Sequence, residues 1–290
     1  MSKRKILITG KGSYVGTSFM KWVEQWPDQY EVLELSVRGA EWKEHDFSVY
    51  DVVLHVAGIA HVSTDPSMEQ QYYKINRDLA IEVAEKAKKE YVKQFIFMSS
   101  MIIYGADGKI GEDKIITKDT KPNPIDFYGR SKLEADNVIQ KLNSEDFKTV
   151  SVRTPMVYGP NCKGNFSKLK QLAKKCPLFP DIRNQRSMIF IDNLSEFLRL
   201  VINSESVGVF HPQNKEYICT TNIIKLMALE MGKKIMFLKI FNYALGIVSG
   251  KYKIINKVFG SKVYDKKLSN HFNWKYCVVG LNESIIKSLK

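Results

Sequence analysis

The stretch ITGKGSYVGTSF, residues 8–19, decides the fold of this chain. It begins at the end of a short apolar run, turns through three glycines and leads into a segment of helical character. Such a turn can point backbone N–H groups at a pyrophosphate, which the positive end of the helix also favours. The stretch therefore predicts a dinucleotide site, with a purely structural turn as the alternative. We assign to cofactor binding Gly10, Gly12, Ser13, Tyr14, Val15 and Gly16.

Beyond this stretch, short apolar runs alternate with helical periodicity. The clearest helical segment is 68–89, where apolar residues recur at three- and four-residue steps. The alternation predicts an α/β fold, a doubly wound parallel sheet with helices on both faces. The expected strands are residues 6–9, 31–36, 52–56, 94–98, 150–153 and 207–210.

The pattern changes after Pro155, where Gly-, Pro- and Asn-containing loops replace the regular alternation. It returns at 189–202 and gives way to a Lys-rich C-terminal region. We therefore expect a dinucleotide-binding domain and a smaller C-terminal substrate-binding lobe. The domain comprises 1–155 and 186–211, and the lobe comprises 156–185 and 212–290.

Length and composition indicate a globular enzyme. The 290 residues are 44% hydrophobic, enough for a large core. The four cysteines are widely spaced, which predicts neither a metal site nor a disulfide framework. The first apolar run stops at Gly10, and no stretch approaches the roughly 20 apolar residues of a membrane span. We expect a cytoplasmic protein without stable membrane insertion.

The formal net charge of +13 favours an anionic partner, such as a phosphorylated small molecule, a nucleic acid or an acidic membrane surface. No nucleic-acid-binding motif accompanies the lysines, so we expect no nucleic acid partner. In residues 233–267, large apolar side chains interleave with lysines. This pattern suits an interfacial helix, but we favour helices packed within the small lobe.

The second expected strand ends in Leu35-Ser36-Val37-Arg38. Sites that prefer NAD usually end this strand with an acid that accepts hydrogen bonds from the adenine ribose. Arg38 suits the 2′-phosphate of NADP instead, unless it is an ordinary surface arginine. The cofactor is therefore NADP or NAD, with NADP favoured.

Polar side chains are expected at the carboxyl ends of the strands, where such sheets bind their ligands. Tyr128 and Lys132 are four residues apart at the start of a helix, and Ser100 follows the fourth strand. Tyr and Lys at this spacing share a helix face, so the lysine charge favours the ionised phenol. A tyrosine tuned in this way can transfer a proton near neutrality, and Ser100 would hydrogen bond to the reacting oxygen. We predict these three residues as catalytic.

Several motifs occur in a recognisable order. These are the glycine turn, HVAG (55–58), SSMIIYG (99–105), YGRSK (128–132) and VRTPMVYGP (152–160). Together they resemble, over about residues 3–214, the extended short-chain dehydrogenase/reductases of the NAD-dependent epimerase/dehydratase family. More narrowly, they look like its nucleotide-sugar branch. The resemblance implies a Rossmann-type fold, although Ser13 replaces the middle glycine of the family pattern.

By this resemblance, Asp46 and Phe47 would flank the adenine, Asn76 would lie near the active site, and Pro155 would border the nicotinamide. Ala57 and Gly58, in HVAG, are added to the cofactor-binding set. Arg186 would bind the diphosphate of a UDP-sugar, with a structural salt bridge as the alternative, and Asn165 would contact its phosphate or sugar.

The resemblance also implies hydride transfer at C4 of a UDP-hexose or UDP-N-acetylhexosamine, with Tyr128 moving the proton on the C4 oxygen. Arg38 and the missing ribose acid favour a 4-ketoreductase of polysaccharide biosynthesis. The alternative is a UDP-glucose or UDP-GlcNAc 4-epimerase with tightly bound NAD. Dehydratases usually carry Asp-Glu where Met101 and Ile102 stand here, so we expect no dehydratase activity.

A catalytically silent NAD(P)-binding sensor is a hypothesis of another class. The complete set Ser100, Tyr128 and Lys132 argues against it, because a sensor needs no proton relay. Many members of the family dimerise through the helices that would carry Asn76 and Tyr128, so we expect a homodimer.

Overall fold

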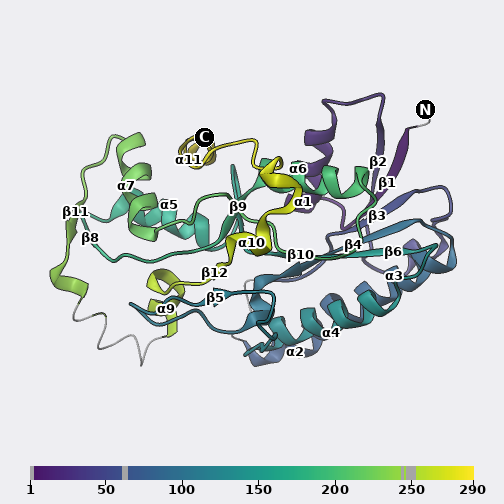
Figure 1. Cartoon of the computed structure of the whole chain (residues 1–290), viewed down its shortest axis with the longest axis horizontal. Coiled ribbons are helices and arrows are strands. Elements are labelled where there is room, and N and C mark those ends of the chain that lie inside the picture. The colour runs from purple at the N-terminus through teal and green to yellow at the C-terminus, as the bar shows by residue number, and fades with distance from the viewer. Residues whose placement is uncertain (1–2, 61–64, 243–244, 246–252) are drawn as a thin grey trace. The chain divides into compact units, whose positions relative to one another are not determined.

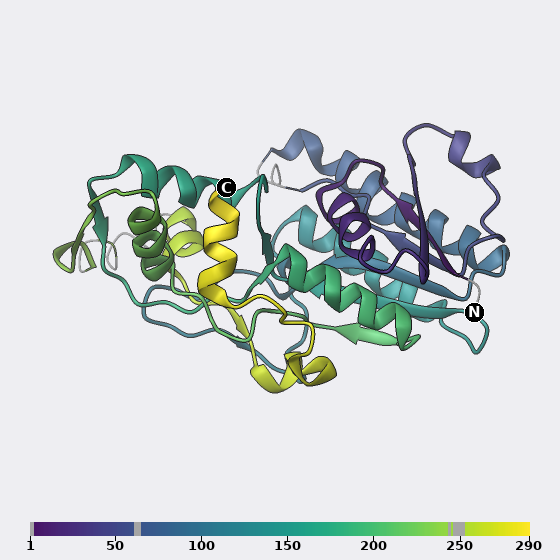
Figure 2. The same ribbon diagram turned by 90° about the horizontal axis from the view of Figure 1, so that it is seen from above.

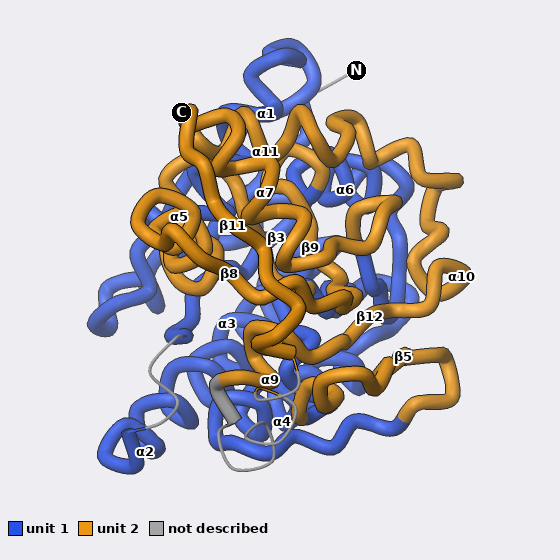
Figure 3. The backbone as a smooth tube through the Cα atoms, turned by 90° about the vertical axis from the view of Figure 1, so that its left-hand side faces the viewer, with its two compact units in different colours: residues 1–105, 121–154, 194–212 blue, residues 106–120, 155–193, 213–290 orange. Residues whose placement is uncertain are grey.

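The computed structural model describes residues 3–60, 65–242, 245 and 253–290. Its backbone divides into two compact units, coloured blue and orange in Figure 3. Unit 1 comprises residues 1–105, 121–154 and 194–212. Unit 2 comprises residues 106–120, 155–193 and 213–290.

The centre of unit 1 is a six-stranded parallel sheet in the order β10-β6-β4-β3-β1-β2. All four residues of β3 are buried, as are all but the last residue of β4. Continuous burial is typical of parallel strands that have helices on both faces. The predicted fold class is therefore confirmed. The strands are β1 (Arg4–Thr9), β2 (Tyr30–Leu35), β3 (Val52–His55), β4 (Gln94–Ser100), β6 (Lys148–Thr154) and β10 (Gly208–Phe210).

Helices cover both faces of this sheet. Figure 1 shows α3 (Leu79–Lys89) and α4 (Phe127–Lys141) on one face, with α1 (Tyr14–Val23) and α6 (Ile191–Asn203) on the other. Figure 2 shows the second pair from above. Small alanines on α3 and α4 let both helices pack closely on the strands. This arrangement brings the carboxyl ends of the strands to one edge of the sheet, where the candidate site lies.

Residues 68–89 do not form the single regular helix that the apolar spacing predicts. A 3₁₀ turn, η2 (Pro66–Met68), is followed by α2 (Glu69–Tyr72) and by a π-helical segment, η3 (Tyr73–Asp78), which leads into α3. Tyr72, Val83 and Ala87 of the predicted apolar stripe are buried, whereas Ile75 and Leu79 are only partly buried. The π-helical segment contains the buried Asn76, and such segments frequently mark functional sites.

Unit 2 is built from short elements. Parallel two-stranded pairs join β7 to β9, β5 to β12 and β8 to β11. The strands are β5 (Ile115–Ile116), β7 (Met156–Tyr158), β8 (Leu178–Pro180), β9 (Met188–Phe190), β11 (Met236–Leu238) and β12 (Val263–Tyr264). The helices are α5 (Asn165–Lys175), α7 (Thr220–Glu230), α9 (Lys253–Phe259), α10 (Lys266–Ser269) and α11 (Leu281–Leu289). Short 3₁₀ turns are η1 (Glu41–Glu44) and η4 (Met101–Tyr104) in unit 1 and η5 (His271–Trp274) in unit 2.

The units differ from the predicted domain boundaries at residues 155 and 212 and in two longer segments. Residues 106–120 lie in unit 2 because they contain β5, which pairs with β12. Residues 186–193 also lie in unit 2, since β9 pairs with β7. Within the part of the chain described, no helix has both the length and the apolar character needed to cross a membrane. Part of the Lys-rich segment, residues 243–244 and 246–252, lies outside the described residues.

Candidate active site

The glycine turn between β1 and α1 forms the floor of the site. Gly10 has a φ of +126°, and a Cβ built there would lie 2.7 Å from the backbone N of Ala57. Ser13 caps α1, because its hydroxyl accepts from the N–H of Gly16 at 3.1 Å. A Cβ on Gly16 would lie 2.7 Å from that hydroxyl oxygen. Only glycine fits these close approaches without rearrangement, as the turn of a dinucleotide site requires.

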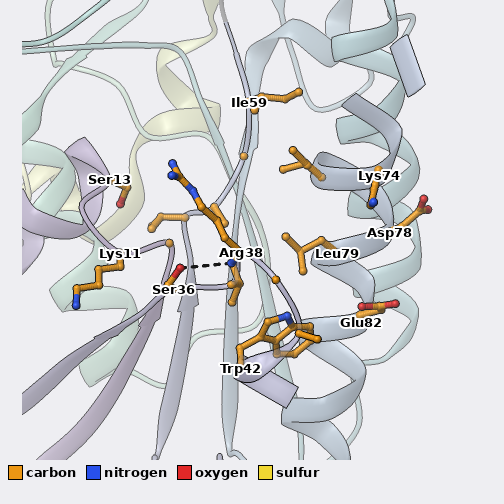
Figure 4. Close-up of a pocket in the computed structure, with 18 of the residues that line it drawn as sticks. Lys11, Ser13, Ser36, Arg38, Trp42, Ile59, Lys74, Asp78, Leu79 and Glu82 are labelled. Carbon is orange, nitrogen blue, oxygen red and sulfur yellow. Dashed lines mark hydrogen bonds between the residues drawn. The ribbon is translucent and has the colours of Figure 1, made fainter. Parts of the chain in front are cut away.

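Beside this turn lies a cavity of about 910 Å³, shown in Figure 4. Its wall comes from the turn, the segment after β2, the loop after β3 and the helices α2, η3 and α3. This volume is at the upper end of the range for small-molecule sites, so the cavity can hold a ligand as long as a dinucleotide. The predicted cofactor residues in the wall are Gly10, Gly12, Ser13, Arg38, Ala57 and Gly58.

Other predicted cofactor residues lie elsewhere in unit 1. Tyr14 and Val15 form the first turn of α1. Phe47 is fully buried in the core, and hydrogen bonds from the hydroxyl and the N–H of Ser48 to the Asp46 carboxylate lower the pKa of Asp46. Among the described residues of this segment, the cavity wall contains Trp42 and Lys43 rather than Asp46 or Phe47. Asp46 and Phe47 therefore do not line this cavity, and their predicted contact with the adenine stays a prediction.

The end of β2 carries a feature that the sequence interpretation missed. Ser36 and the exposed Arg38 line the cavity, and Figure 4 shows Arg38 between Ser13 and Lys74. Glu34 Oε1 accepts from the N–H of Gly12 at 3.3 Å, so a carboxylate stands at the glycine turn after all. Its contact with the N–H of Gly12 arises only when β2 and the turn are folded together, so the sequence pattern did not mark Glu34.

Tyr128 lies in the first turn of α4, which Asp126 caps by accepting from the N–H of Gly129 at 2.8 Å. Its phenol is hydrogen bonded to Ser100, the last residue of β4. Burial raises the pKa of Tyr128 to about 12, while the Ser100 hydrogen bond acts in the opposite direction. The phenol is therefore protonated at neutral pH in this structure and can act as a proton donor.

Lys132 lies one helical turn further along α4 and is buried. Its Nζ donates to the carbonyl of Met98 at 2.9 Å and lies 4.7 Å from the centre of the Phe97 ring. Burial lowers the pKa of Lys132 to about 8. We expected its charge to act directly on Tyr128. Burial and the Ser100 hydrogen bond are the main influences on the pKa of Tyr128, and the direct action of Lys132 on the phenol stays a prediction.

Asn76 joins this group to the cavity wall. Its side chain accepts from the N–H of Ile59 at 2.9 Å and donates to the carbonyl of Ile59 at 3.0 Å, which fixes the loop after β3. A Cβ built on Gly58 would lie 2.9 Å from Asn76 Oδ1 and 3.3 Å from Lys132 Nζ. Both side chains therefore pack directly behind Gly58, which lines the cavity.

The remaining predicted residues belong to unit 2. Arg186 donates to the carbonyl of Gly260 at 3.0 Å and pairs with Asp107 at 3.4 Å, which is the arrangement of the salt-bridge alternative. Asn165 is the exposed first residue of α5, and Pro155 directly follows β6. Their contacts with substrate or cofactor stay predictions. The described residues contain no cluster of His, Cys, Asp or Glu suited to a metal ion.

The Tyr128 phenol contacts the Ser100 hydroxyl, and the Lys132 ammonium lies beside a dinucleotide-sized cavity. These groups suit proton transfer to or from an alcohol or ketone during oxidoreduction. The sheet and glycine turn place the chain among Rossmann-fold enzymes. Residues 6–211 match the model of the "NAD dependent epimerase/dehydratase family". The chain belongs to this family. The predicted resemblance, the enzymatic nature of the protein and a nicotinamide dinucleotide as its cofactor are thereby confirmed.

Individual relatives share fewer than a third of the aligned residues with this chain. The chain is 28% identical to a UDP-glucose 4-epimerase of Vibrio cholerae, over 91% of this chain and 85% of that protein. It is 26% identical to N-acetyl-alpha-D-glucosaminyl-diphospho-ditrans,octacis-undecaprenol 4-epimerase of Escherichia coli O157:H7, over 89% and 81% of the two chains. The solved UDP-glucuronic acid 4-epimerase of Bacillus cereus in complex with NAD has a TM-score of 0.76. It is 19% identical over 98% of this chain and 97% of its own, and so confirms the fold.

Proposed function

We propose that this chain is an NAD(P)-dependent oxidoreductase that acts at C4 of a UDP-sugar, with net reduction of a 4-keto sugar as its reaction. The observation that carries the proposal is the contact of Tyr128 with Ser100, together with Lys132 packed behind the cavity wall at Gly58. This set occupies the carboxyl edge of the sheet, where ligands of such folds bind. A silent sensor would not need it.

Each of the three residues has a distinct part in this reaction. A bound nicotinamide supplies the hydride that reaches C4. Tyr128, neutral in this structure, donates its proton to the C4 oxygen, and the Ser100 hydroxyl holds that oxygen by a hydrogen bond. The Lys132 ammonium, held by the carbonyl of Met98, provides a positive charge beside the cavity.

Net reduction is favoured by the residues at the end of β2. A reductase needs a cofactor that exchanges after each turnover, and cells commonly use NADPH in that role. Ser36 stands where a ribose-binding acid is usual, and Arg38 lines the cavity with its guanidinium exposed. A guanidinium can bind a 2′-phosphate by two hydrogen bonds. These features support NADPH over NADH.

A 4-epimerase with tightly bound NAD is the second candidate. The relatives from Vibrio cholerae and Escherichia coli are both named 4-epimerases. Glu34 at the N–H of Gly12 also supplies a negative charge near the turn, which opposes a 2′-phosphate. An epimerase returns the hydride to the sugar, so its cofactor shows no net change.

A UDP-sugar is the proposed substrate because one relative is named for UDP-glucose and because the net charge of +13 favours an anionic ligand. In unit 2, Asn165 at the N-terminus of α5 is well placed to attract phosphate. Arg186 would have to exchange its contact with Asp107 for the diphosphate.

Two incubations distinguish the candidates. In the first, UDP-4-keto-6-deoxy-GlcNAc and NADPH are mixed with the protein, and the nicotinamide absorbance is followed. In the second, UDP-GlcNAc or UDP-glucose is incubated without added cofactor, and the sugar is analysed by NMR. A reductase consumes NADPH only in the first, and Tyr128→Phe should abolish the loss. Epimerised sugar in the second, without NADPH consumption in the first, supports the epimerase. Neither reaction, in a protein that binds the cofactor, would overturn the proposal.

A further inference from the structure

Helix α4 carries a third ionisable side chain in line with the catalytic pair. Asp136 is four residues beyond Lys132 and eight beyond Tyr128, so the three lie on successive turns of one helix face. Asp136 is fully buried. Buried carboxylates are rare unless other groups neutralise and hydrogen bond to them.

Asp136 has such partners on two strands and its own helix. Its Oδ2 accepts from Ser99 Oγ at 2.8 Å and from Arg153 Nε at 2.9 Å, and Gln140 donates to its Oδ1. Arg153 also donates to the Tyr104 hydroxyl at 2.7 Å. The side chains of Asp136 and Arg153 are 0% and 11% exposed, so solvent screens this ion pair weakly.

The network is attached to the residues that hold the catalytic side chains. Ser99 stands between Met98, whose carbonyl holds Lys132, and Ser100, which contacts Tyr128. Arg153 is the partner of Ser99 in the register of β4 and β6. Asp136 therefore links α4 to β4 at the position where both strand and helix contribute to the site.

The charges around Lys132 give Asp136 a second effect. Asp136, on the same helix, raises the pKa of Lys132 against the larger effect of burial. His55, on β3, also interacts with Lys132. Burial and the Lys132 charge lower the pKa of His55 to about 3, so this imidazole is neutral. Around Asp136 itself, Arg153 comes from β6 and Tyr104 from η4. Within this described group, Asp136 supplies the negative charge that keeps the Lys132 ammonium protonated.

We propose that Asp136, held by Arg153 and Ser99, is a positioning residue of the active site that fixes α4 against β4 and places a negative charge one helical turn from Lys132, without touching the substrate. The proposal deepens the proposed function and rests on it for the catalytic importance of Lys132. The charge relation between Asp136 and Lys132 can be measured without any substrate.

The direct test is the Asp136→Asn variant of the full chain, which removes the charge at nearly constant shape. The amine of Lys132 is labelled with traces of acetic anhydride at a series of pH values, and the labelled peptide is quantified by mass spectrometry. Removal of a nearby opposite charge should lower the labelling midpoint of Lys132, from about 8, by about one pH unit. In the reductase assay, the alkaline decline of kcat should move to lower pH by a similar amount, with KM nearly unchanged.

Two controls separate charge from structure. Glu134→Gln removes a carboxylate from the same helix, but Glu134 is half-exposed and pairs with Arg77 at 2.8 Å. It should leave the Lys132 midpoint unchanged. Asp136→Glu keeps the charge and should restore a midpoint near that of the unaltered protein. Thermal unfolding of every variant shows which of them keep the fold.

An unchanged midpoint in folded Asp136→Asn would overturn the proposal. If that variant does not fold, Arg153→Gln serves instead, because glutamine can still donate to Asp136 or Tyr104. Loss of the guanidinium leaves the Asp136 charge less neutralised, so the Lys132 midpoint should rise, and a fall or no change would contradict the proposal. Failure of the proposed function would appear as absent turnover with the labelling shift intact.

Discussion

Tyr128 and Ser100 meet at the point where a helix begins and a strand ends, so the phenol oxygen has a fixed direction. For Tyr128→Phe we expect kcat to fall by about 10²- to 10⁴-fold, because the proton donor is lost. Dinucleotide affinity should remain within about twofold, since the ring and its contact with Tyr72 persist. Steady-state kinetics and a fluorescence titration with NADPH check both. Turnover close to that of the unaltered protein would remove Tyr128 from the mechanism.

Lys132 carries a charge that folding must bury. Its pKa falls from 10.5 to about 8, which corresponds to about 3 kcal/mol of lost stability at neutral pH. Lys132→Met removes this cost but leaves the Met98 carbonyl without its donor, at about 1 kcal/mol. We expect an inactive variant that is about 2 kcal/mol more stable at pH 7, measured by urea unfolding.

The same pKa shift predicts how the stability difference between the two proteins changes with pH. Between pH 8 and 10.5 the folded protein has lost the Lys132 proton that the unfolded chain still binds. The unaltered protein therefore gains stability with rising pH in that window. The free energy of unfolding of the unaltered protein should therefore approach that of Lys132→Met as the pH rises from 8 to 10.5. A deficit that grows, or a variant less stable at pH 7, would contradict the buried charge.

Arg38 decides between the two forms of the cofactor. Loss of a charge-assisted pair with the 2′-phosphate should weaken NADPH binding to Arg38→Gln by about 10- to 100-fold, with NADH affinity nearly unchanged. Fluorescence titrations with both cofactors make the comparison, and Lys11→Gln in the same cavity wall is the control for general loss of charge. Equal effects on both cofactors would make Arg38 an ordinary surface arginine and favour the epimerase.

Some of these site residues could be predicted from the sequence, and others could not. Ser100, Tyr128 and Lys132 were predictable because each follows a recognisable strand or opens a recognisable helix. Glu34 was missed because its importance comes from the N–H of Gly12, which only the folded turn brings to it. The Asp136 network was hidden for the same reason, since β4, β6 and α4 assemble it from separate parts of the chain.

At the level of elements, the turn between β1 and α1 contains two glycines with different demands. Gly10→Ala would place a Cβ 2.7 Å from the backbone of Ala57, whereas a Cβ on Gly12 meets nothing within 4 Å. Both glycines have positive φ, so Gly12→Ala has only the strain of about 1–2 kcal/mol. Gly10→Ala should lose several kcal/mol and weaken dinucleotide binding far more.

Urea unfolding and NADPH titration of the two variants test this difference. Equal losses would show that backbone strain alone, and not the approach of the turn to the loop after β3, requires glycine at position 10.

The segment of residues 68–89 shows where periodicity stops being informative. Apolar spacing indicated the buried stripe, but a π-helical segment shifts hydrogen bonds without removing the stripe. Asn76 lies in this segment and binds both backbone groups of Ile59. Asn76 follows the apolar position Ile75, and its partner in a distant loop could not be inferred from spacing.

For the whole molecule, strand and helix alternation was sufficient to predict the parallel sheet of unit 1, because its central strands β3 and β4 are compact buried runs. Unit 2 has strands of two or three residues, too short to show a period. Its boundaries at 106–120 and 186–193 depend on pairs such as β5 with β12, whose strands are far apart in sequence. A homodimer stays a prediction, which analytical ultracentrifugation would test by mass.

The most direct test of the account is whether hydride from the nicotinamide reaches C4 of the sugar under control of Tyr128. NADPH deuterated at the nicotinamide C4, in both stereochemical forms, is incubated with UDP-4-keto-6-deoxy-GlcNAc, and the product is analysed by NMR and mass spectrometry. We predict deuterium at the sugar C4 from one of the two forms, and none with Tyr128→Phe. A product without deuterium at C4, or the same transfer in Tyr128→Phe, would contradict the account.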